Sequence, residues 1–152
     1  MIDFVNSSQV FLDVSAASVD DALEFLAGKA AELGITDDKT AVLDGLQARE
    51  AEGTTGMMSG FAIPHCKSAA IKNASVLVVK FANPVAWDSM DGNPIKVAIS
   101  LLVPDGEVST TFLKMLSTVA VMLMDEGFRS KIEATNDKDA IAAIINSGLE
   151  DK

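Results

Sequence analysis

The chain has 152 residues, of which 49% are hydrophobic and 22% charged, and its formal net charge at pH 7 is -10. This is the composition of a globular protein rather than a disordered one, and we expect a single domain over residues 1–152. The negative charge argues against electrostatic binding of nucleic acid or anionic lipid, and it favours a partner with a basic surface.

The chain contains one cysteine, Cys66, and one histidine, His65. A single cysteine cannot form an internal disulfide, and the two residues are too few for a cluster of metal ligands, so we expect neither a metal nor a cofactor and interpret Cys66 as structural. The N-terminus shows no basic segment followed by an apolar stretch, and the apolar runs are too short to span a bilayer. These features indicate a soluble protein of the reduced cytoplasm.

The first third of the chain predicts one strand and two helices. Apolar residues alternate with other residues over positions 9–14, as in a half-buried strand. A helix is predicted over residues 18–34, from a capping serine with aspartates in the first turn to a terminal glycine. A second helix is predicted to open at Thr36 and to end at Gly53, which places Arg49 in its last turns.

The middle of the chain predicts the strands of a sheet. The patterns fall at residues 61–63, where a short strand would end at His65, and at residues 74–81, 85–87 and 95–103. The last of these is the most apolar, so we expect it at the centre of the sheet. Asp91-Gly92 predicts a tight turn before it.

The C-terminal third predicts helices. The first is capped by Thr110 or Thr111 and ends at Gly127, and a turn follows through residues 128–134. The last helix is capped by Asn136 or Asp137 and closes at Gly148. Strands framed by helices on either side predict an α/β fold, a three-layer sandwich whose mixed central sheet is flanked by helices on both faces.

Residues 49–65 concentrate side chains and backbone groups that suit phosphate. The imidazole of His65 has a pKa near neutrality, so it can act as a neutral nucleophile toward phosphorus. The guanidinium of Arg49 fits phosphate oxygens, and a loop of hydroxyl-bearing and glycine residues supplies further donors. The candidate phosphate-binding residues of this loop are Thr54, Thr55, Gly56 and Ser59. Their spacing matches neither GxxxxGK[ST] nor GxGxxG, so nucleotide binding is not indicated.

Each of these residues also has a structural interpretation. A lone histidine is commonly a hydrogen-bonded structural residue, and a glycine and threonine loop is commonly only a turn. Arg49 could be an exposed helix residue that pairs with a neighbouring carboxylate, for which the candidates are Asp44, Glu50 and Glu52. Three apolar residues near the histidine could either fill the core or form a docking rim for a carrier protein. They are Met57, Met58 and Phe61.

The order of these motifs resembles the fructose/mannitol class of enzyme IIA of the bacterial phosphoenolpyruvate-dependent sugar phosphotransferase system, whose fold is the phosphotransferase/anion transport protein type. The resemblance covers nearly the whole chain and rests on Arg49-Glu50, Thr54-Thr55-Gly56, Gly60-Phe61-Ala62-Ile63-Pro64-His65 and residues 84–88, 91–95 and 112–116. It implies that His65 accepts a phosphoryl group from phospho-HPr and passes it to a cysteine of a IIB domain, and that Arg49 balances the phosphate charge. Membrane association would be indirect, through a IIC component.

Two positions depart from the family pattern. Phe112 stands where the family has a second active-site histidine, and phenylalanine can neither donate a hydrogen bond nor carry charge. Thr111, beside it near a helix start, could bind phosphate instead. Met58 stands where the family has glycine.

These departures leave two functions open. One is a phosphocarrier in the uptake of a fructose-like sugar, and the other is a regulatory module of the same fold in which phosphorylation of His65 signals to a partner. A hydrolase with His65 as general base lacks a nucleophile and an orienting residue at recognisable spacing.

Overall fold

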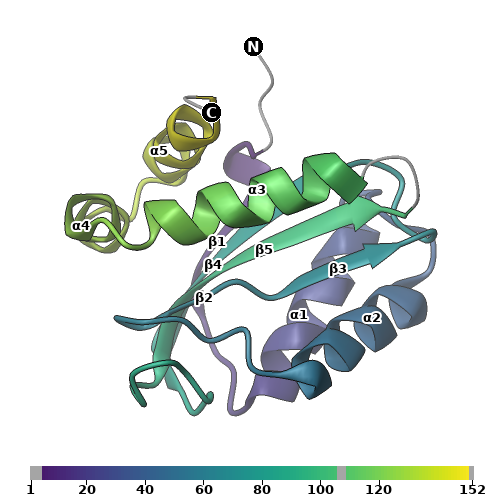
Figure 1. Ribbon diagram of the computed structural model, residues 1–152, viewed down its shortest axis with the longest axis horizontal. Coiled ribbons are helices and arrows are strands. Elements are labelled where there is room, and N and C mark those ends of the chain that lie inside the picture. Colours follow the sequence, from purple (N-terminus) through teal and green to yellow (C-terminus); the bar gives the residue numbers. More distant parts are fainter. Residues whose placement is uncertain (1–4, 106–108, 151–152) are drawn as a thin grey trace.

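A mixed five-stranded sheet lies at the centre of the molecule (Figure 1). The computed structural model describes residues 5–105 and 109–150, with the side chains of residues 5–105 and 113–149. In chain order the elements are a 3-10 turn (Ser7–Gln9), β1 (Val10–Val14), α1 (Val19–Glu32), α2 (Lys39–Glu52), β2 (Phe61–Ala62), β3 (His65–Ser68), β4 (Ser75–Val85), β5 (Ile95–Pro104), α3 (Ser109–Met122), α4 (Glu126–Ala134) and α5 (Lys138–Glu150). Among the described residues, no helix has both the length and the apolar character needed to cross a membrane.

The strand order is β1-β4-β5, and β2 and β3 both pair with the far side of β5. β4 and β5 are antiparallel, whereas the other pairs are parallel, which makes the sheet mixed. The prediction that residues 95–103 form a central strand is therefore confirmed. The separate strand predicted at residues 85–87 does not form, because Val85 is the last residue of β4, which reaches it through an irregular register, and residues 86 and 87 lie in the following loop.

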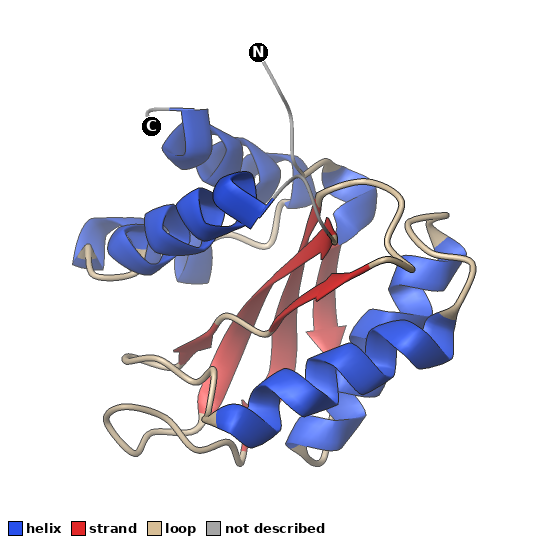
Figure 2. Cartoon of the chain, turned by 45° about the vertical axis from the view of Figure 1, so that its right-hand side comes forward, coloured by secondary structure: helices blue, strands red, loops and turns tan. Residues whose placement is uncertain are grey.

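Helices cover both faces of the sheet (Figures 1 and 2). Successive side chains of a strand point to opposite faces, so β4 and β5 contribute alternate residues to two cores. Val76 and Leu101 pack with residues of α3, α4 and α5, while Leu77 and Leu102 pack with residues of α1 and α2. The predicted three-layer sandwich is confirmed.

The start of α2 differs from the prediction. Asp38 caps this helix by accepting a hydrogen bond from the backbone of Ala41 at 3.1 Å. The hydroxyl of Thr36 instead donates to the carbonyl of Ala70 at 2.7 Å, which ties the segment before α2 to the loop after β3. The helix ends as predicted at Gly53, whose φ of 154° lies outside the range that other residues readily adopt.

His65 begins a strand rather than ending one. β2 stops at Ala62 and β3 starts at His65, and both run parallel to β5. Pro64, between them, has no N–H to donate to the ladder, although its carbonyl accepts from Leu101 at 3.1 Å. The proline therefore interrupts the strand and leaves His65 in register with Leu101.

The C-terminal part has one helix more than predicted. Residues 126–134 form α4 where the sequence predicts a turn, and Gly127 lies in its first turn rather than ending α3. Asp125 caps α4 by accepting from the N–H of Gly127 at 3.0 Å. At the other end, Lys80 of β4 donates to the carbonyls of residues 132, 133 and 135, where a positive charge suits the helix dipole.

The last helix, α5, begins after Asp137 as predicted, because the Asp137 carboxylate accepts from the backbone N–H groups of Asp139 and Ala140. It continues past Gly148 to Glu150. A Cβ at Gly148 would overlap the side chain of Met122, so this glycine allows close packing of α5 on α3 rather than ending the helix.

Candidate active site

His65 lies on the edge strand β3, and only 7% of its surface is exposed. Its register with Leu101 places the ring on the face of the sheet that α3 covers. Nδ1 lies 2.7 Å from the carbonyl oxygen of Ile63. Because a carbonyl only accepts, Nδ1 carries the proton of the neutral ring and Nε2 keeps its lone pair. The geometry presents Nε2 as the nucleophilic atom.

Burial lowers the pKa of His65 from its ordinary value of 6.5, because the charged ring would lose its hydration. The hydrogen bond to Ile63 opposes this shift, and the positive charge of Arg49 adds to it. The carboxylates of Glu50 and Glu52 act in the opposite direction to Arg49. The ring is therefore neutral at pH 7, which is the form that can attack phosphorus.

Arg49, in the last turn of α2, contacts the ring of His65 directly. Its Nε donates to Nε2 of His65 at 3.0 Å, and its Nη1 donates to the carbonyl of Gly53 at 2.7 Å. Within the part of the chain that the structure describes, no ion pair includes Arg49. Arg49 thus pairs with the histidine rather than with a carboxylate of its own helix.

Glu50 holds the loop that follows α2. Its Oε2 accepts from the backbone N–H of Thr55 at 2.9 Å and from the indole Nε1 of Trp87 at 3.1 Å, while its Oε1 accepts from the hydroxyl of Thr55 at 2.6 Å. Three donors therefore satisfy one carboxylate. Thr55 is 4% exposed, so this contact fixes a buried point of the loop.

The remaining predicted phosphate donors of the loop are bonded within the protein. The hydroxyl of Thr54 donates to the carbonyl of Asp88 at 2.5 Å and accepts from the N–H of Gly56 at 3.0 Å. Both side-chain and backbone donors of Thr55 are held by Glu50. Phosphate binding by these residues stays a prediction, and it requires them to exchange protein acceptors for phosphate oxygens.

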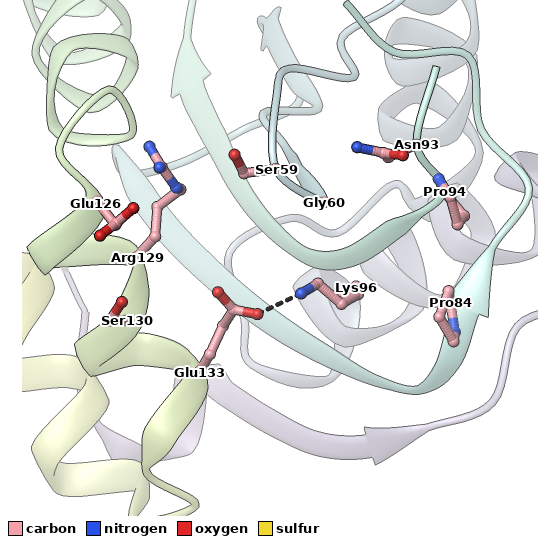
Figure 3. A pocket seen from close by; sticks show the side chains of 10 residues that line it. All are labelled: Ser59, Gly60, Pro84, Asn93, Pro94, Lys96, Glu126, Arg129, Ser130 and Glu133. Atoms are coloured by element: carbon pink, nitrogen blue, oxygen red, sulfur yellow. Dashed lines mark hydrogen bonds and ion pairs between the residues drawn. The ribbon is translucent and has the colours of Figure 1, made fainter. Parts of the chain in front are cut away.

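Ser59 lies at a different place on the surface. Its N–H donates to the Asp91 carboxylate at 2.8 Å, a hydrogen bond that lowers the pKa of Asp91. With Gly60 it lines a groove of about 500 Å³ whose other wall is α4 and which includes Arg129 and the ion pair of Lys96 with Glu133 (Figure 3). His65 does not line this groove.

A family model for the phosphoenolpyruvate-dependent sugar phosphotransferase system, EIIA 2, matches residues 3–148. The chain belongs to this family. Two curated relatives are each 34% identical to this EIIA domain over 143 residues. One is the fructose-specific EIIA component of Haloferax volcanii, with 93% of this chain and 91% of the relative covered. The other is a nitrogen regulatory protein of Bradyrhizobium diazoefficiens, with 94% and 92% covered.

Solved structures share the fold of this EIIA domain. The nitrogen regulatory protein IIA-Ntr of Neisseria meningitidis is 27% identical, with a TM-score of 0.85 over 93% of this chain and 96% of that one. The mannitol enzyme IIA of Escherichia coli, solved in complex with phosphorylated enzyme IIB, has a TM-score of 0.78 at 15% identity and covers 94% of this chain and 97% of its own. The relatives therefore include both sugar-specific and regulatory members.

The two positions at the start of α3 fall outside the described side chains. The backbone places Thr111 and Phe112 in the first turn of this helix, which begins at Ser109. The predictions that Thr111 binds phosphate and that Phe112 replaces a histidine therefore concern side chains outside the described residues.

The apolar residues near the histidine mostly serve the core of the EIIA domain. Phe61 is fully buried, and Met57 packs against the same cluster. Met58 is half-buried. The docking rim considered from the sequence therefore cannot include Phe61.

Cys66 points away from its neighbour His65. It belongs to the core on the α2 face, only 2% of its surface is exposed, and burial raises the pKa of its thiol to about 11. Since the thiolate is the reactive form, Cys66 is unreactive at neutral pH.

Sequence reasoning missed the supporting contacts of this EIIA site. The sequence offers Glu50 only as a possible partner of Arg49, and it indicates no separate role for Ile63 or Trp87. The Arg49-Glu50 pair in the family resemblance is the one signal that could have drawn attention to Glu50, because Trp87 is 37 residues away in sequence.

Proposed function

We propose that this EIIA domain is a phosphocarrier that accepts a phosphoryl group on Nε2 of His65 from phospho-HPr and passes it to a IIB cysteine. The observation that carries the proposal is the pair of hydrogen bonds on the ring: Ile63 holds the proton on Nδ1 and Arg49 contacts Nε2. Family membership supports phosphotransfer as the activity. The uptake of a fructose-like sugar and a cytoplasmic location belong to the same proposal.

Arg49 has to leave the lone pair of Nε2 before the ring can react. Its bond to Gly53 keeps the guanidinium beside the site, and the N–H groups released from the ring can donate to the phosphoryl oxygens. Nε2 then forms a bond to phosphorus while the bond from phosphorus to the donor atom of HPr breaks, and the electron pair of that bond stays with the donor. No further base is required, because the attacking nitrogen carries no proton.

The carbonyl of Ile63 favours the second transfer. Phosphorylation leaves the proton on Nδ1, and the resulting positive ring is stabilised by its hydrogen bond to Ile63. A positively charged ring is a good leaving group. A thiolate of IIB can therefore attack phosphorus, and the electron pair of the Nε2–P bond returns to the ring.

The choice of IIB as acceptor is supported by the solved complex of the structurally similar mannitol enzyme IIA with phosphorylated IIB. An association with the membrane component IIC would follow from the same assembly. His65 lies on an edge strand and is mostly buried, so the proposal requires the partner to approach this strand closely.

The proposal is tested by incubating the protein with enzyme I, HPr and phosphoenolpyruvate and measuring incorporated phosphate by intact mass. We expect one acid-labile phosphoryl group in the wild-type protein and in Cys66→Ser, and none in His65→Ala. Absence of incorporation into the wild-type protein, or its persistence in His65→Ala, would contradict the proposal.

A regulatory module is the second candidate function, and Phe112 at the position of the family's second histidine favours it. The equal identity to a nitrogen regulatory protein and to a fructose-specific component supports both candidates. The two are separated by mixing the phosphorylated protein with IIB domains. Rapid discharge indicates sugar uptake, whereas a phosphoprotein that stays loaded indicates regulation.

A further inference from the structure

We propose that Glu50 is a positioning residue for phosphoryl transfer, which holds His65 in its reactive tautomer through Thr55 and Ile63. This inference deepens the proposed function and rests on it for its catalytic meaning. It concerns a residue that touches neither the ring nor the phosphoryl group in the chemistry described above.

The contacts form a continuous path from the carboxylate to the ring. Glu50 accepts both the N–H and the hydroxyl of Thr55, at 2.9 and 2.6 Å. The carbonyl of Thr55 accepts from the N–H of Ile63 at 3.0 Å, and the carbonyl of Ile63 accepts from Nδ1 of His65 at 2.7 Å. Glu50 thus holds Thr55, Thr55 holds the N–H of Ile63, and the carbonyl of Ile63, in the next peptide, holds the proton on Nδ1.

Arg49 reaches the ring by a second and separate route. Glu50 follows Arg49 in α2, and Arg49 contacts both Nε2 of His65 and the carbonyl of Gly53, two residues before Thr55. During transfer the Arg49–His65 bond must break, which removes the hydrogen bond from Arg49 to Nε2. The Glu50–Thr55–Ile63 path does not include Arg49, so it can keep the tautomer fixed while the guanidinium moves.

The hydrogen bonds on the Glu50 carboxylate have a second effect. A carboxylate next to Arg49 in sequence could draw the guanidinium away from the histidine through an ion pair. Three donors from Thr55 and Trp87 direct the Glu50 oxygens toward the loop, and among the described residues no ion pair joins Glu50 to Arg49. Besides its charge, which raises the pKa of His65, Glu50 therefore contributes geometry that a neutral residue of the same shape should largely reproduce.

Glutamine is such a residue. A carboxamide oxygen can accept from Thr55 and Trp87 where Oε2 now does, and its NH₂ can donate to the Thr55 hydroxyl oxygen. Alanine removes every one of these bonds. Glu52→Ala is the matched control, because Glu52 is an exposed carboxylate at the same helix end whose charge also raises the pKa of His65.

The test uses the fact that the chain has one histidine, so labelling with ¹⁵N-histidine gives a single ring spectrum. Above its pKa we expect the wild-type and Glu52→Ala proteins to show the Nδ1–H tautomer, and Glu50→Ala to show a mixture. The rate of phosphorylation by phospho-HPr should fall at least about tenfold in Glu50→Ala and stay within about threefold of wild type in Glu50→Gln. Thr55→Val, which removes only the hydroxyl, should lie between them and guards against a folding defect in Glu50→Ala.

A single Nδ1–H tautomer and a wild-type rate in Glu50→Ala or Thr55→Val would overturn the inference. A rate in Glu50→Gln as low as in Glu50→Ala would overturn it as well, because charge rather than position would then be decisive. The tautomer is measured without phosphorylation. A wild-type protein that accepts no phosphate but loses its tautomer in Glu50→Ala would therefore refute the proposed function and leave the coupling of Glu50 to His65 intact.

Discussion

In the proposed transfer the lone pair on Nε2 of His65 has two competing uses, because it accepts a hydrogen bond from Arg49 and would have to attack phosphorus. In the resting arrangement Arg49 therefore blocks the lone pair that would react. The guanidinium that blocks the ring is also the group best placed to bind the incoming phosphoryl oxygens. In the proposed mechanism the same side chain fulfils both roles, because its release from Nε2 frees its N–H groups for the phosphoryl oxygens.

Arg49→Lys separates charge from geometry at this position. Lysine keeps the positive charge but lacks the planar fork that reaches His65 and Gly53 together. We expect the rate of phosphorylation to fall about a hundredfold, as when one preorganised donor is lost from a transition-state site. Single-turnover transfer from phospho-HPr measures this, and a rate equal to wild type would show that charge alone is sufficient.

The lowered pKa of His65 predicts the pH dependence of both reactivity and stability. The rate of phosphorylation should stay constant as the pH falls past 6.5 and decline only at the lower pKa of the folded protein.

The stability of the fold should also depend on this pKa. The unfolded chain binds its proton already near pH 6.5, so the stability that the neutral ring contributes is present above that pH and is lost as the pH falls toward the folded pKa. A ¹⁵N titration measures the pKa of His65 in the folded protein, and denaturant unfolding at several pH values measures the stability. His65→Gln should remove this part of the pH dependence of stability.

At the scale of elements, the position of Arg49 depends on how closely α2 packs on β3. Gly45 of α2 faces Cys66 of β3, and a Cβ at Gly45 would overlap the Cys66 sulfur. Neither residue takes part in the proposed chemistry. Together they set the distance between the helix that carries Arg49 and the strand that carries His65.

Gly45→Ala should therefore destabilise the protein by about 1–3 kcal/mol through overpacking. In a Cys66→Ala background the overlap is relieved, and the alanine should instead stabilise by up to about 1 kcal/mol through its helix propensity. A double-mutant cycle of urea unfolding tests this change of sign. An equal effect of Gly45→Ala in both backgrounds would show that the contact is unimportant.

The sequence predicted those elements whose ends carry strong local signals. Gly53 ends α2 and Asp137 caps α5, as expected from their conformational and capping preferences. The missed helix α4 is short and has a glycine in its first turn, so its pattern resembles a turn, and Lys80 from a distant strand holds its C-terminal end. The start of β3 at His65 was missed because parallel pairing with β5 cannot be inferred from four residues.

At the scale of the whole molecule, the site is made by contacts between residues that are distant in the sequence. Arg49 and His65 are 16 residues apart, and composition and pattern alone left their pairing undecided. The family resemblance brought them together as candidates. The contact of Glu50 with Trp87 could not be predicted, because it depends on the loop between β4 and β5 lying against the end of α2.

The net charge of -10 predicts how the proposed donor finds the site. A donor protein with a basic surface is steered toward an acidic one, and salt screens this attraction over a Debye length of about 10 Å at 0.1 M ionic strength. We expect the second-order rate constant for transfer from phospho-HPr to fall at least about tenfold between about 0.05 and 0.5 M salt. The first-order rate within the saturated complex should change little, because steering acts on association. Stopped-flow measurements over a range of protein concentrations separate the second-order from the first-order rate constant. A second-order constant that does not vary with salt would show that the negative charge of the protein has no part in recognising the donor.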